Sequence, residues 1–150
     1  MIACAMIVGA YPIGERSKAR KLEACVELGA RASDAGRDVS LILAMSWIES
    51  AFEPKAKSKA GALGMLQILP RYFCPRRRAK GCDLIAAGFR AIDAWAALSK
   101  SRCEMLCKYN GGHVCGRRSR LYAHRVANIQ RVIAPTLSAP PLSCRRRLLD

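Results

Sequence analysis

Hydrophobic side chains recur every three or four residues in two stretches of the first third of the chain, and this spacing predicts two amphipathic α-helices. Ser17 is a candidate N-cap for the first helix, and Gly36 is well placed beyond its end. Either Asp38 or Ser40 precedes the second helix, which Pro54 prevents from continuing because proline has no backbone N–H to donate. The chain therefore opens with two helices.

Three more helices are predicted in the second half of the chain. One begins at Asp83, and the next follows the candidate N-cap Ser101 and stops at the Tyr-Asn-Gly-Gly sequence of residues 109–112. The last covers residues 120–133 and ends before Pro135. Since no stretch alternates hydrophobic and polar residues as a half-buried strand would, the predicted fold class is mainly α.

The segment between the second and third predicted helices, residues 54–75, lacks a helical period because serine, glycine and proline residues interrupt it. Its hydrophobic run, residues 62–69, is long enough for a short buried turn of helix. An ordered loop is therefore expected in the middle of the sequence.

The chain has 150 residues, of which 51% are hydrophobic, and this is enough for one domain with a buried core. No uninterrupted hydrophobic run approaches the roughly 18 residues that cross a bilayer, which argues against a membrane-spanning segment. We divide the chain into an N-terminal segment (1–16), a helical domain (17–134) and a basic tail rich in proline and serine (135–150). The tail is expected to be extended or disordered.

Residues 1–10 are hydrophobic and end in the small residues Gly9 and Ala10, like a segment that signal peptidase removes. The run only just reaches the length of a signal-peptide core, and no Lys or Arg precedes it. A clipped signal peptide and a short buried segment of the mature domain are equally compatible with this sequence. Removal would take Cys4 away and leave seven cysteines, one of them unpaired or paired between chains.

The chain carries 26 Lys and Arg residues against 11 Asp and Glu, and its net charge of +15 attracts nucleic acid, anionic lipid or anionic cell-wall polymers. The basic residues form short clusters spread along the chain, at residues 16–21, 76–80, 117–125 and 145–147. Each cluster is more typical of a solvated surface than of a recognition element. Because aromatic residues make up only 6%, the basic face with interleaved aromatics that indicates nucleic-acid binding is lacking, and no nucleic-acid partner is predicted.

Eight cysteines are many for a chain of this length, and zinc sites compete with disulfides as the explanation. Cys107, His113 and Cys115 could supply three zinc ligands, but no paired knuckle repeats along the chain. An even number of cysteines in a small chain favours disulfides formed in an oxidising compartment. The sequence therefore predicts disulfides and no metal site.

Two of these disulfides are expected to close short loops. Cys74 pairs with Cys82 in this prediction, and Cys107 pairs with Cys115. Cys103 and Cys107 instead share one helix face with both side chains leaning the same way, which is a poor geometry for a bond.

Glu49 is a candidate catalytic residue because hydrophobic residues surround it on the second predicted helix. Met45, Ile48 and Phe52 are its helical neighbours, and Trp47 precedes it by two residues. A carboxyl among apolar neighbours is costly to ionise, so its pKa is expected to rise. A carboxylic acid that keeps its proton near neutral pH can serve as a general acid.

The sequence of residues 49–70, ESAFEPKAKSKAGALGMLQILP, resembles the signature of lytic transglycosylases of the soluble (SLT) type, in the lysozyme-like superfamily. The positions in register are Glu49, Ser50, Phe52, Pro54, Ala56, Ser58, Gly61, Ala62, Gly64, Gln67 and Ile68. The family's Tyr-Asn-x-Gly block falls on residues 109–112, and residues 122–126 are similar to its closing helix. The chain departs from the pattern at Leu84, where the family usually has an Asn at the start of a helix.

The resemblance implies a lysozyme-like helical domain with an ordered active-site loop, which cleaves the β-1,4 bond between N-acetylmuramic acid and N-acetylglucosamine in peptidoglycan glycan strands. It implies no cofactor. Glu49 would protonate the leaving oxygen and then, as a base, take the proton of the 6-hydroxyl that closes a 1,6-anhydro ring. The acetamido group of the substrate stabilises the developing charge, so that the second carboxylate of an ordinary glycosidase is not needed. Substrate-binding roles are implied for Ser58, Gly64, Met65, Gln67, Tyr109 and Asn110.

Two alternatives stay open in the sequence. A goose-type lysozyme of the same fold would hydrolyse the bond with water, and Glu53, Asp83 and Asp93 are the candidates for its second carboxylate. A non-catalytic wall-binding module is disfavoured because Glu49 is present. The expected location is the periplasm or the outside of the cell, with a phage particle as another setting.

Overall fold

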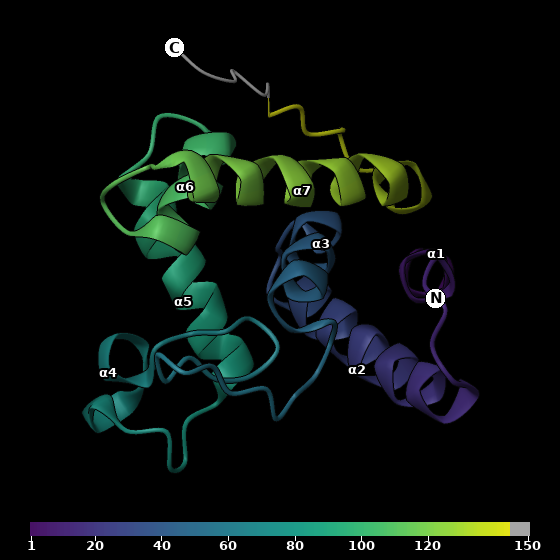
Figure 1. The fold of residues 1–150 in the computed structure, drawn as a ribbon, viewed down its shortest axis with the longest axis horizontal. Coiled ribbons are helices and arrows are strands. Elements are labelled where there is room, and N and C mark those ends of the chain that lie inside the picture. The colour runs from purple at the N-terminus through teal and green to yellow at the C-terminus, as the bar shows by residue number, and fades with distance from the viewer. Residues whose placement is uncertain (145–150) are drawn as a thin grey trace.

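The computed structural model describes residues 1–144, which form α-helices joined by loops and two short 3-10 turns, with no strand among them (Figure 1). The α-helices are α1 (Ile2–Gly9), α2 (Glu15–Asp34), α3 (Val39–Ser50), α4 (Pro70–Phe73), α5 (Leu84–Ala97), α6 (Arg102–Gly111) and α7 (Arg117–Ile133); the 3-10 turns are η1 (Pro75–Arg77) and η2 (Ala134–Leu137). The mainly α fold class is confirmed and fits a lysozyme-like helical domain. The basic cluster at residues 145–147 lies outside the described residues.

Helix α3 is the centre of the fold because it is hydrophobic on every side. Its side chains from Ser40 to Trp47 are all buried, and α1, α2 and α7 pack around it (Figure 1). The buried Ser40 hydroxyl accepts a hydrogen bond of 2.8 Å from the side-chain amide of Gln130 on α7. Helix α3 ends one residue after Glu49, which places the candidate acid where the helix leaves the core.

Polar caps and a glycine set several of the helix ends. Asp38 caps α3 and Ser101 caps α6, as predicted, each by accepting a backbone N–H of the first turn. Gly36 has φ +63° just beyond α2, where a left-handed residue ends the helix. The prediction that Ser17 caps α2 is wrong: this helix begins earlier, after Gly14, and the Ser17 N–H donates to the Gly14 carbonyl within the first turn.

The start of α5 explains how the chain tolerates Leu84, its departure from the family pattern. The Asp83 carboxylate accepts hydrogen bonds from the backbone N–H groups of Ile85 and Ala86, at 3.1 and 3.0 Å. Asp83 therefore satisfies the free N–H groups of the first turn that an Asn would otherwise serve.

The ordered loop predicted in the middle of the sequence joins α3 to α4 and is held by its own backbone. The N–H and carbonyl groups of Leu63 and Ile68 bond to each other, at 2.8 and 3.1 Å, and close a turn over the residues between them. The short helical turn predicted for this hydrophobic run is wrong. Gly64 and Gln67 have φ values of +74° and +47°, and left-handed residues cannot continue a right-handed helix.

The hydrophobic N-terminal segment forms α1, and one side of this helix joins the core. Ala3, Cys4, Ile7 and Val8 are buried, and Cys4 is in a disulfide with Cys25 of α2. This is the arrangement expected of a buried segment of the domain. Removal of the segment as a signal peptide stays a prediction.

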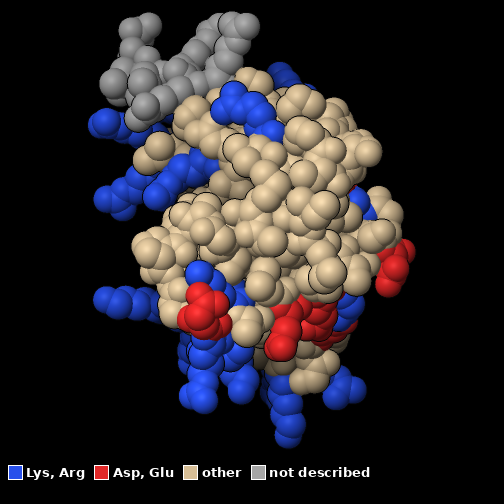
Figure 2. Space-filling view, turned by 90° about the vertical axis from the view of Figure 1, so that its right-hand side faces the viewer, with Lys and Arg blue, Asp and Glu red and all other residues tan. Residues whose placement is uncertain are grey.

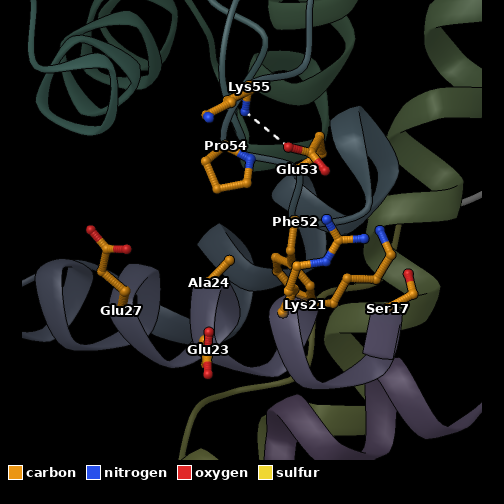
Figure 3. A pocket seen from close by; sticks show the side chains of 10 residues that line it. Ser17, Lys21, Glu23, Ala24, Glu27, Phe52, Glu53, Pro54 and Lys55 are labelled. Carbon is orange, nitrogen blue, oxygen red and sulfur yellow. Dashed lines mark hydrogen bonds between the residues drawn. The ribbon is translucent and has the colours of Figure 1, made fainter. Parts of the chain in front are cut away.

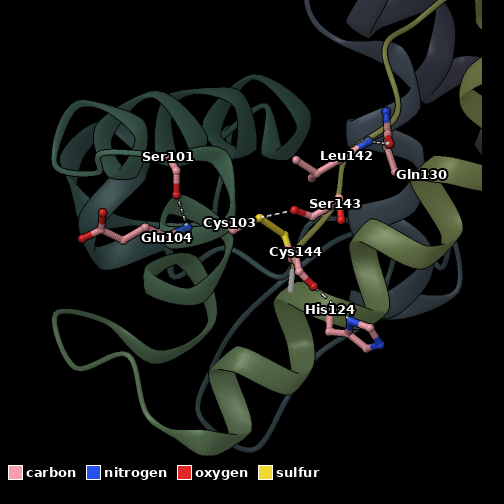
Figure 4. The surroundings of a disulfide bond; sticks show 8 residues. All are labelled: Ser101, Cys103, Glu104, His124, Gln130, Leu142, Ser143 and Cys144. Carbon is pink, nitrogen blue, oxygen red and sulfur yellow. Dashed lines mark hydrogen bonds between the residues drawn. A yellow bond between two sulfur atoms is a disulfide. The ribbon is translucent and has the colours of Figure 1, made fainter. Parts of the chain in front are cut away.

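The tail up to residue 144 is fixed to the helical domain (Figure 4). Gln130 donates to the Pro140 carbonyl (3.0 Å) and accepts from the Leu142 N–H (2.7 Å). A disulfide joins Cys144 to Cys103 on α6, which the sequence had left without an assigned partner. The tail was predicted to be either extended or disordered. Between η2 and residue 144 it is extended.

The two disulfides predicted to close short loops, Cys74–Cys82 and Cys107–Cys115, are both confirmed. Within residues 1–144 no group of three His, Cys, Asp or Glu side chains is arranged to hold a metal ion. In the same range no helix combines the length and hydropathy required to cross a membrane.

Candidate active site

Glu49 is a half-buried carboxyl in the last turn of α3, and its pKa is strongly perturbed. Burial among apolar side chains raises the pKa of Glu49 from its ordinary value of 4.5 to about 7. This confirms the rise that its hydrophobic neighbours predicted. At neutral pH a sizeable fraction of this carboxyl still carries its proton, as a general acid requires.

Two tyrosines from different helices, the buried Tyr122 and the partly buried Tyr109, lie close enough to Glu49 for its charge to affect their pKa values. Burial, and then the Glu49 carboxylate, raise the pKa of Tyr109 on α6 and of Tyr122 on α7 well above the ordinary range. The Tyr122 hydroxyl lies near the carboxyl and lowers the pKa of Glu49, but it is buried and makes no hydrogen bond of normal geometry within the described residues. The Tyr109 hydroxyl instead donates to the Leu66 carbonyl (2.6 Å).

The chain turns sharply just after Glu49, and contacts from two other segments hold this turn. Ala51 and Phe52 both have left-handed φ values, of 50° and 59°, which is costly for residues with a β-carbon. The Lys21 ammonium donates to the Ala51 carbonyl (2.6 Å) and so neutralises part of the negative end of the α3 dipole. The Ser50 hydroxyl donates to the Met65 carbonyl (2.9 Å). The end of α3 is therefore tied to both α2 and the loop.

The loop residues predicted to bind substrate are fixed by internal contacts. The Gln67 amide donates to the Gly64 carbonyl (2.9 Å) and to the Ala56 carbonyl (3.3 Å). Gly64 packs closely against Leu84 of α5: a β-carbon at this position would lie 3.1 Å from the Leu84 side chain. The Ser58 hydroxyl accepts the Ala62 N–H (3.0 Å). These bonds give the loop one defined shape.

A cavity of about 530 Å³ lies between this loop, α4, α5 and the end of α6. Trp95 and His113 contact each other edge to face inside its wall, with ring centroids 5.2 Å apart. Aromatic rings beside a few polar groups are the usual lining of a small-molecule or sugar site. The lining residues are Gln67, Ile68, Leu69, Arg71, Tyr72, Phe73, Ala91, Trp95, Tyr109, Asn110, Gly112 and His113.

The structure brings three of the predicted substrate-binding residues, Gln67, Tyr109 and Asn110, together in the wall of this cavity. Tyr109 connects the cavity to Glu49, which does not itself line it. Three other predicted residues are elsewhere: Met65 is buried in the core, and Ser58 and Gly64 serve the folding of the loop. Their substrate contacts stay predictions.

Sequence reasoning did not single out Tyr122 or Trp95 as site residues. Both lie on hydrophobic helix faces, where the periodicity is that of an ordinary core residue. Tyr122 did fall in the last block of the family resemblance, and this was the one signal for it.

The three carboxylates considered as the second group of a hydrolytic reaction make contacts that do not involve Glu49. Asp83 caps α5 and pairs with Arg31, and Asp93 pairs with Arg37. Glu53 is exposed and accepts the Lys55 N–H at the mouth of a second cavity of about 360 Å³, between α2 and residues 52–55 (Figure 3). Within the described residues no carboxylate contributes to the pKa of Glu49.

A helical domain with a half-buried carboxylic acid of raised pKa, connected through Tyr109 to an aromatic cavity, has the features of the lysozyme-like class of glycan-cleaving enzymes. The family model described as the transglycosylase SLT domain matches residues 27–130, more than half of the chain. The chain belongs to this family and is a lytic transglycosylase acting on peptidoglycan. Comparison with curated proteins and with solved structures found no match.

Proposed function

We propose that this protein cleaves the β-1,4 bond between N-acetylmuramic acid and N-acetylglucosamine and leaves a 1,6-anhydro end, with Glu49 acting first as acid and then as base. The observation that carries this proposal is the half-buried Glu49 carboxyl with a pKa of about 7. A group with this pKa exchanges its proton readily in both directions near neutral pH, so one residue suits both steps.

In the first step the protonated Glu49 gives its proton to the glycosidic oxygen as the bond to the anomeric carbon breaks. The acetamido group of the N-acetylmuramic acid stabilises the positive charge at that carbon. In the second step the Glu49 carboxylate takes the proton of the 6-hydroxyl, whose oxygen bonds to the anomeric carbon and closes the anhydro ring. Glu49 returns to its protonated state, and no water is consumed.

The aromatic cavity is the proposed binding site for sugar rings beside the cleaved bond. Tyr72 and Trp95 offer flat apolar surfaces on which a sugar ring can stack, and the exposed Asn110 offers an amide to hydroxyl or acetamido groups. Gln67 adds a second amide, already oriented by its bonds to the loop. In this proposal Ser58, Gly64 and Met65 contribute by holding the loop in shape.

The environment of Glu49 supports ring closure over hydrolysis. Ordinary glycosidases place a second carboxylate within about 5–10 Å of the first, as a nucleophile or to activate water. Glu53, Asp83 and Asp93 have other contacts, and the side chain that acts on the pKa of Glu49 is Tyr122.

Mass spectrometry of the fragments released from purified peptidoglycan tests this proposal, because a 1,6-anhydro end and a reducing end differ by one water. We expect anhydro ends in the products of the wild-type protein and no release by Glu49→Gln. Reducing ends as the main product would overturn the proposed ring closure and indicate a goose-type lysozyme reaction.

The same proposal puts the enzyme in the periplasm or outside the cell, where its substrate is found. The four disulfides support this location, since such bonds persist in oxidising compartments and are rare in the cytosol. Fractionation of the producing cells, with free thiols blocked before lysis, tests it. Reduced protein confined to the cytosol would contradict the proposal.

A further inference from the structure

One side of α1 is apolar and uncovered. Residues 1–14 contain no charged side chain, and the side of α1 that faces away from the core is exposed. Ile2 is 68% exposed, Met6 39% and Tyr11, just beyond the helix, 44%. A helix without charged residues is normally buried on all sides, whereas half of α1 is exposed. An exposed apolar surface of this kind indicates a binding surface.

The last turns of α7 extend this apolar surface. Val132 is 60% exposed, and together with Ile129 it faces Met6 and Tyr11 across a groove of about 270 Å³. We define the α1–α7 face as Ile2, Met6, Tyr11, Ile129 and Val132. No charged residue lines the groove, and its one amide side chain is Asn128.

Basic side chains border the α1–α7 face. Arg131 donates to Asn128 at the groove (2.6 Å), and Arg125 is exposed one turn earlier on α7. At the start of α2, Glu15 is paired with Lys18. Figure 2 shows this side of the molecule as a broad area free of charged side chains, with Lys and Arg above it, to its left and below it, and with Asp and Glu at its lower and right-hand margins.

We infer that the α1–α7 face docks onto the surface of an anionic lipid bilayer. Interfacial binding of this kind combines burial of apolar side chains at the headgroup level with attraction between basic residues and anionic lipids. Tyr11 suits this depth because its ring is apolar and its hydroxyl stays hydrated. A second copy of the chain is a poor occupant, since each copy carries a net charge of +15 and two copies brought together repel each other.

The position of the face in the fold agrees with this docking. Helix α1 lies at one edge of the molecule, whereas α4, part of the aromatic cavity, lies at the opposite edge (Figure 1). A protein held to a bilayer through α1 and the end of α7 therefore keeps its cavity open to the surroundings. Docking and glycan binding use separate surfaces.

Co-sedimentation with vesicles of phosphatidylcholine containing about one third phosphatidylglycerol tests the inference. We expect binding of the wild-type protein, little binding to pure phosphatidylcholine, and release at about 0.5 M NaCl, where screening is strong. Val132→Asp and Met6→Asp should each weaken the partition coefficient about tenfold, because each puts a charge into the apolar contact. Leu98→Asp is the matched control, since Leu98 is an apolar residue 56% exposed outside the face.

Circular dichroism of each variant shows whether its helices are intact, and Ile2→Asp provides a third, strongly exposed substitution. Failure of the wild-type protein to bind the anionic vesicles would overturn the inference, as would an equal loss of binding with Leu98→Asp. A dimer in sedimentation equilibrium that Val132→Asp dissociates, without vesicle binding, would assign the face to a second copy instead. Because vesicles contain no glycan, none of these outcomes depends on the proposed peptidoglycan reaction.

Discussion

The Tyr109 hydroxyl donates a hydrogen bond of 2.6 Å to the backbone carbonyl of Leu66, a residue 43 positions earlier in the chain. This bond connects the end of α6 to the active-site loop, at a place where the charge of Glu49 raises the pKa of Tyr109. The hydroxyl of Tyr109 therefore fixes the loop, while that of Tyr122 is buried without a hydrogen-bond partner among the described residues.

This difference predicts that removing the Tyr109 hydroxyl destabilises the fold and that removing the Tyr122 hydroxyl does not. Tyr109→Phe leaves the Leu66 carbonyl without its donor and should lower the free energy of unfolding by about 1 kcal/mol. Tyr122→Phe removes an unsatisfied group and should not destabilise the fold. It should instead raise the pKa of Glu49, because the nearby hydroxyl that lowers this pKa is lost. Thermal unfolding and the pH profile of activity measure the two effects, and a stability loss for Tyr122→Phe as large as for Tyr109→Phe would contradict the assignment.

Glu49→Gln should abolish muralytic activity while preserving the fold, because the amide keeps the shape of the side chain but has no proton to give. General acid–base catalysis contributes about 10²- to 10⁴-fold, so the rate of turbidity loss of purified cell walls should fall by at least this factor. Glu53→Gln, in an exposed carboxylate of the same segment, is the control and should retain activity. Unchanged clearance by Glu49→Gln would show that another group is the acid.

The stability of the fold should depend on pH through Glu49. Burial raises its pKa from 4.5 to about 7, so between these values the folded chain holds a proton that the unfolded chain has released. Stability is therefore lost as pH rises from about 4.5 to about 7, by up to about 3 kcal/mol. Glu49→Gln cannot titrate, so it should be more stable than wild type in chemical denaturation at about pH 8 and similar to wild type at about pH 4. A Glu49→Gln variant that is less stable than wild type at about pH 8 would contradict the predicted direction of the pH dependence.

The Cys103–Cys144 disulfide should contribute more to stability than the Cys74–Cys82 disulfide. Their sequence separations are 41 and 8, and a longer closed loop removes more entropy from the unfolded chain. Paired Cys-to-Ser changes should cost about 4 and about 2.5 kcal/mol respectively on this entropic estimate. Loss of the first bond should also make residues 138–144 more sensitive to limited proteolysis, since non-covalent contacts, such as those of Gln130 with Pro140 and Leu142 and of the His124 ring with the Cys144 carbonyl, must then hold them. Equal resistance of this segment in both double variants would contradict the tethering role.

The basic clusters at residues 76–78 and 117–120 should recruit the enzyme to its polymer. Peptidoglycan carries carboxylates on its stem peptides, and Arg76 and Arg117 are exposed. Exposed charges act over a Debye length of about 8 Å at physiological ionic strength, so added salt should weaken sedimentation with insoluble cell wall. Turnover of a short neutral chitooligosaccharide, if it is accepted, should change little with salt. Wall binding that does not change with salt would show that these arginines are ordinary solvated surface residues and do not recruit the enzyme.

The sequence alone predicted the five helices α2, α3, α5, α6 and α7, the loop, and Glu49 as the candidate acid, but not α1 or α4. Local signals carry this information: hydrophobic spacing for the helices, Asp38 and Ser101 for their starts, and the apolar neighbours of Glu49 for its raised pKa. The Ser17 cap failed because the first turn of α2 forms without any side-chain cap, so the sequence contains no marker for its start.

Only the tertiary structure decided which distant residues meet. Tyr122 reads as a core residue from its periodicity, yet the packing of α7 against α3 brings its hydroxyl to Glu49. The pairing of Cys103 with Cys144 likewise depends on the path of the tail over α6 and α7. Helical periodicity determines which side of a helix is buried, but not which other segment packs against that side. Contacts and disulfides between distant segments depend on this packing, so the sequence alone does not predict them.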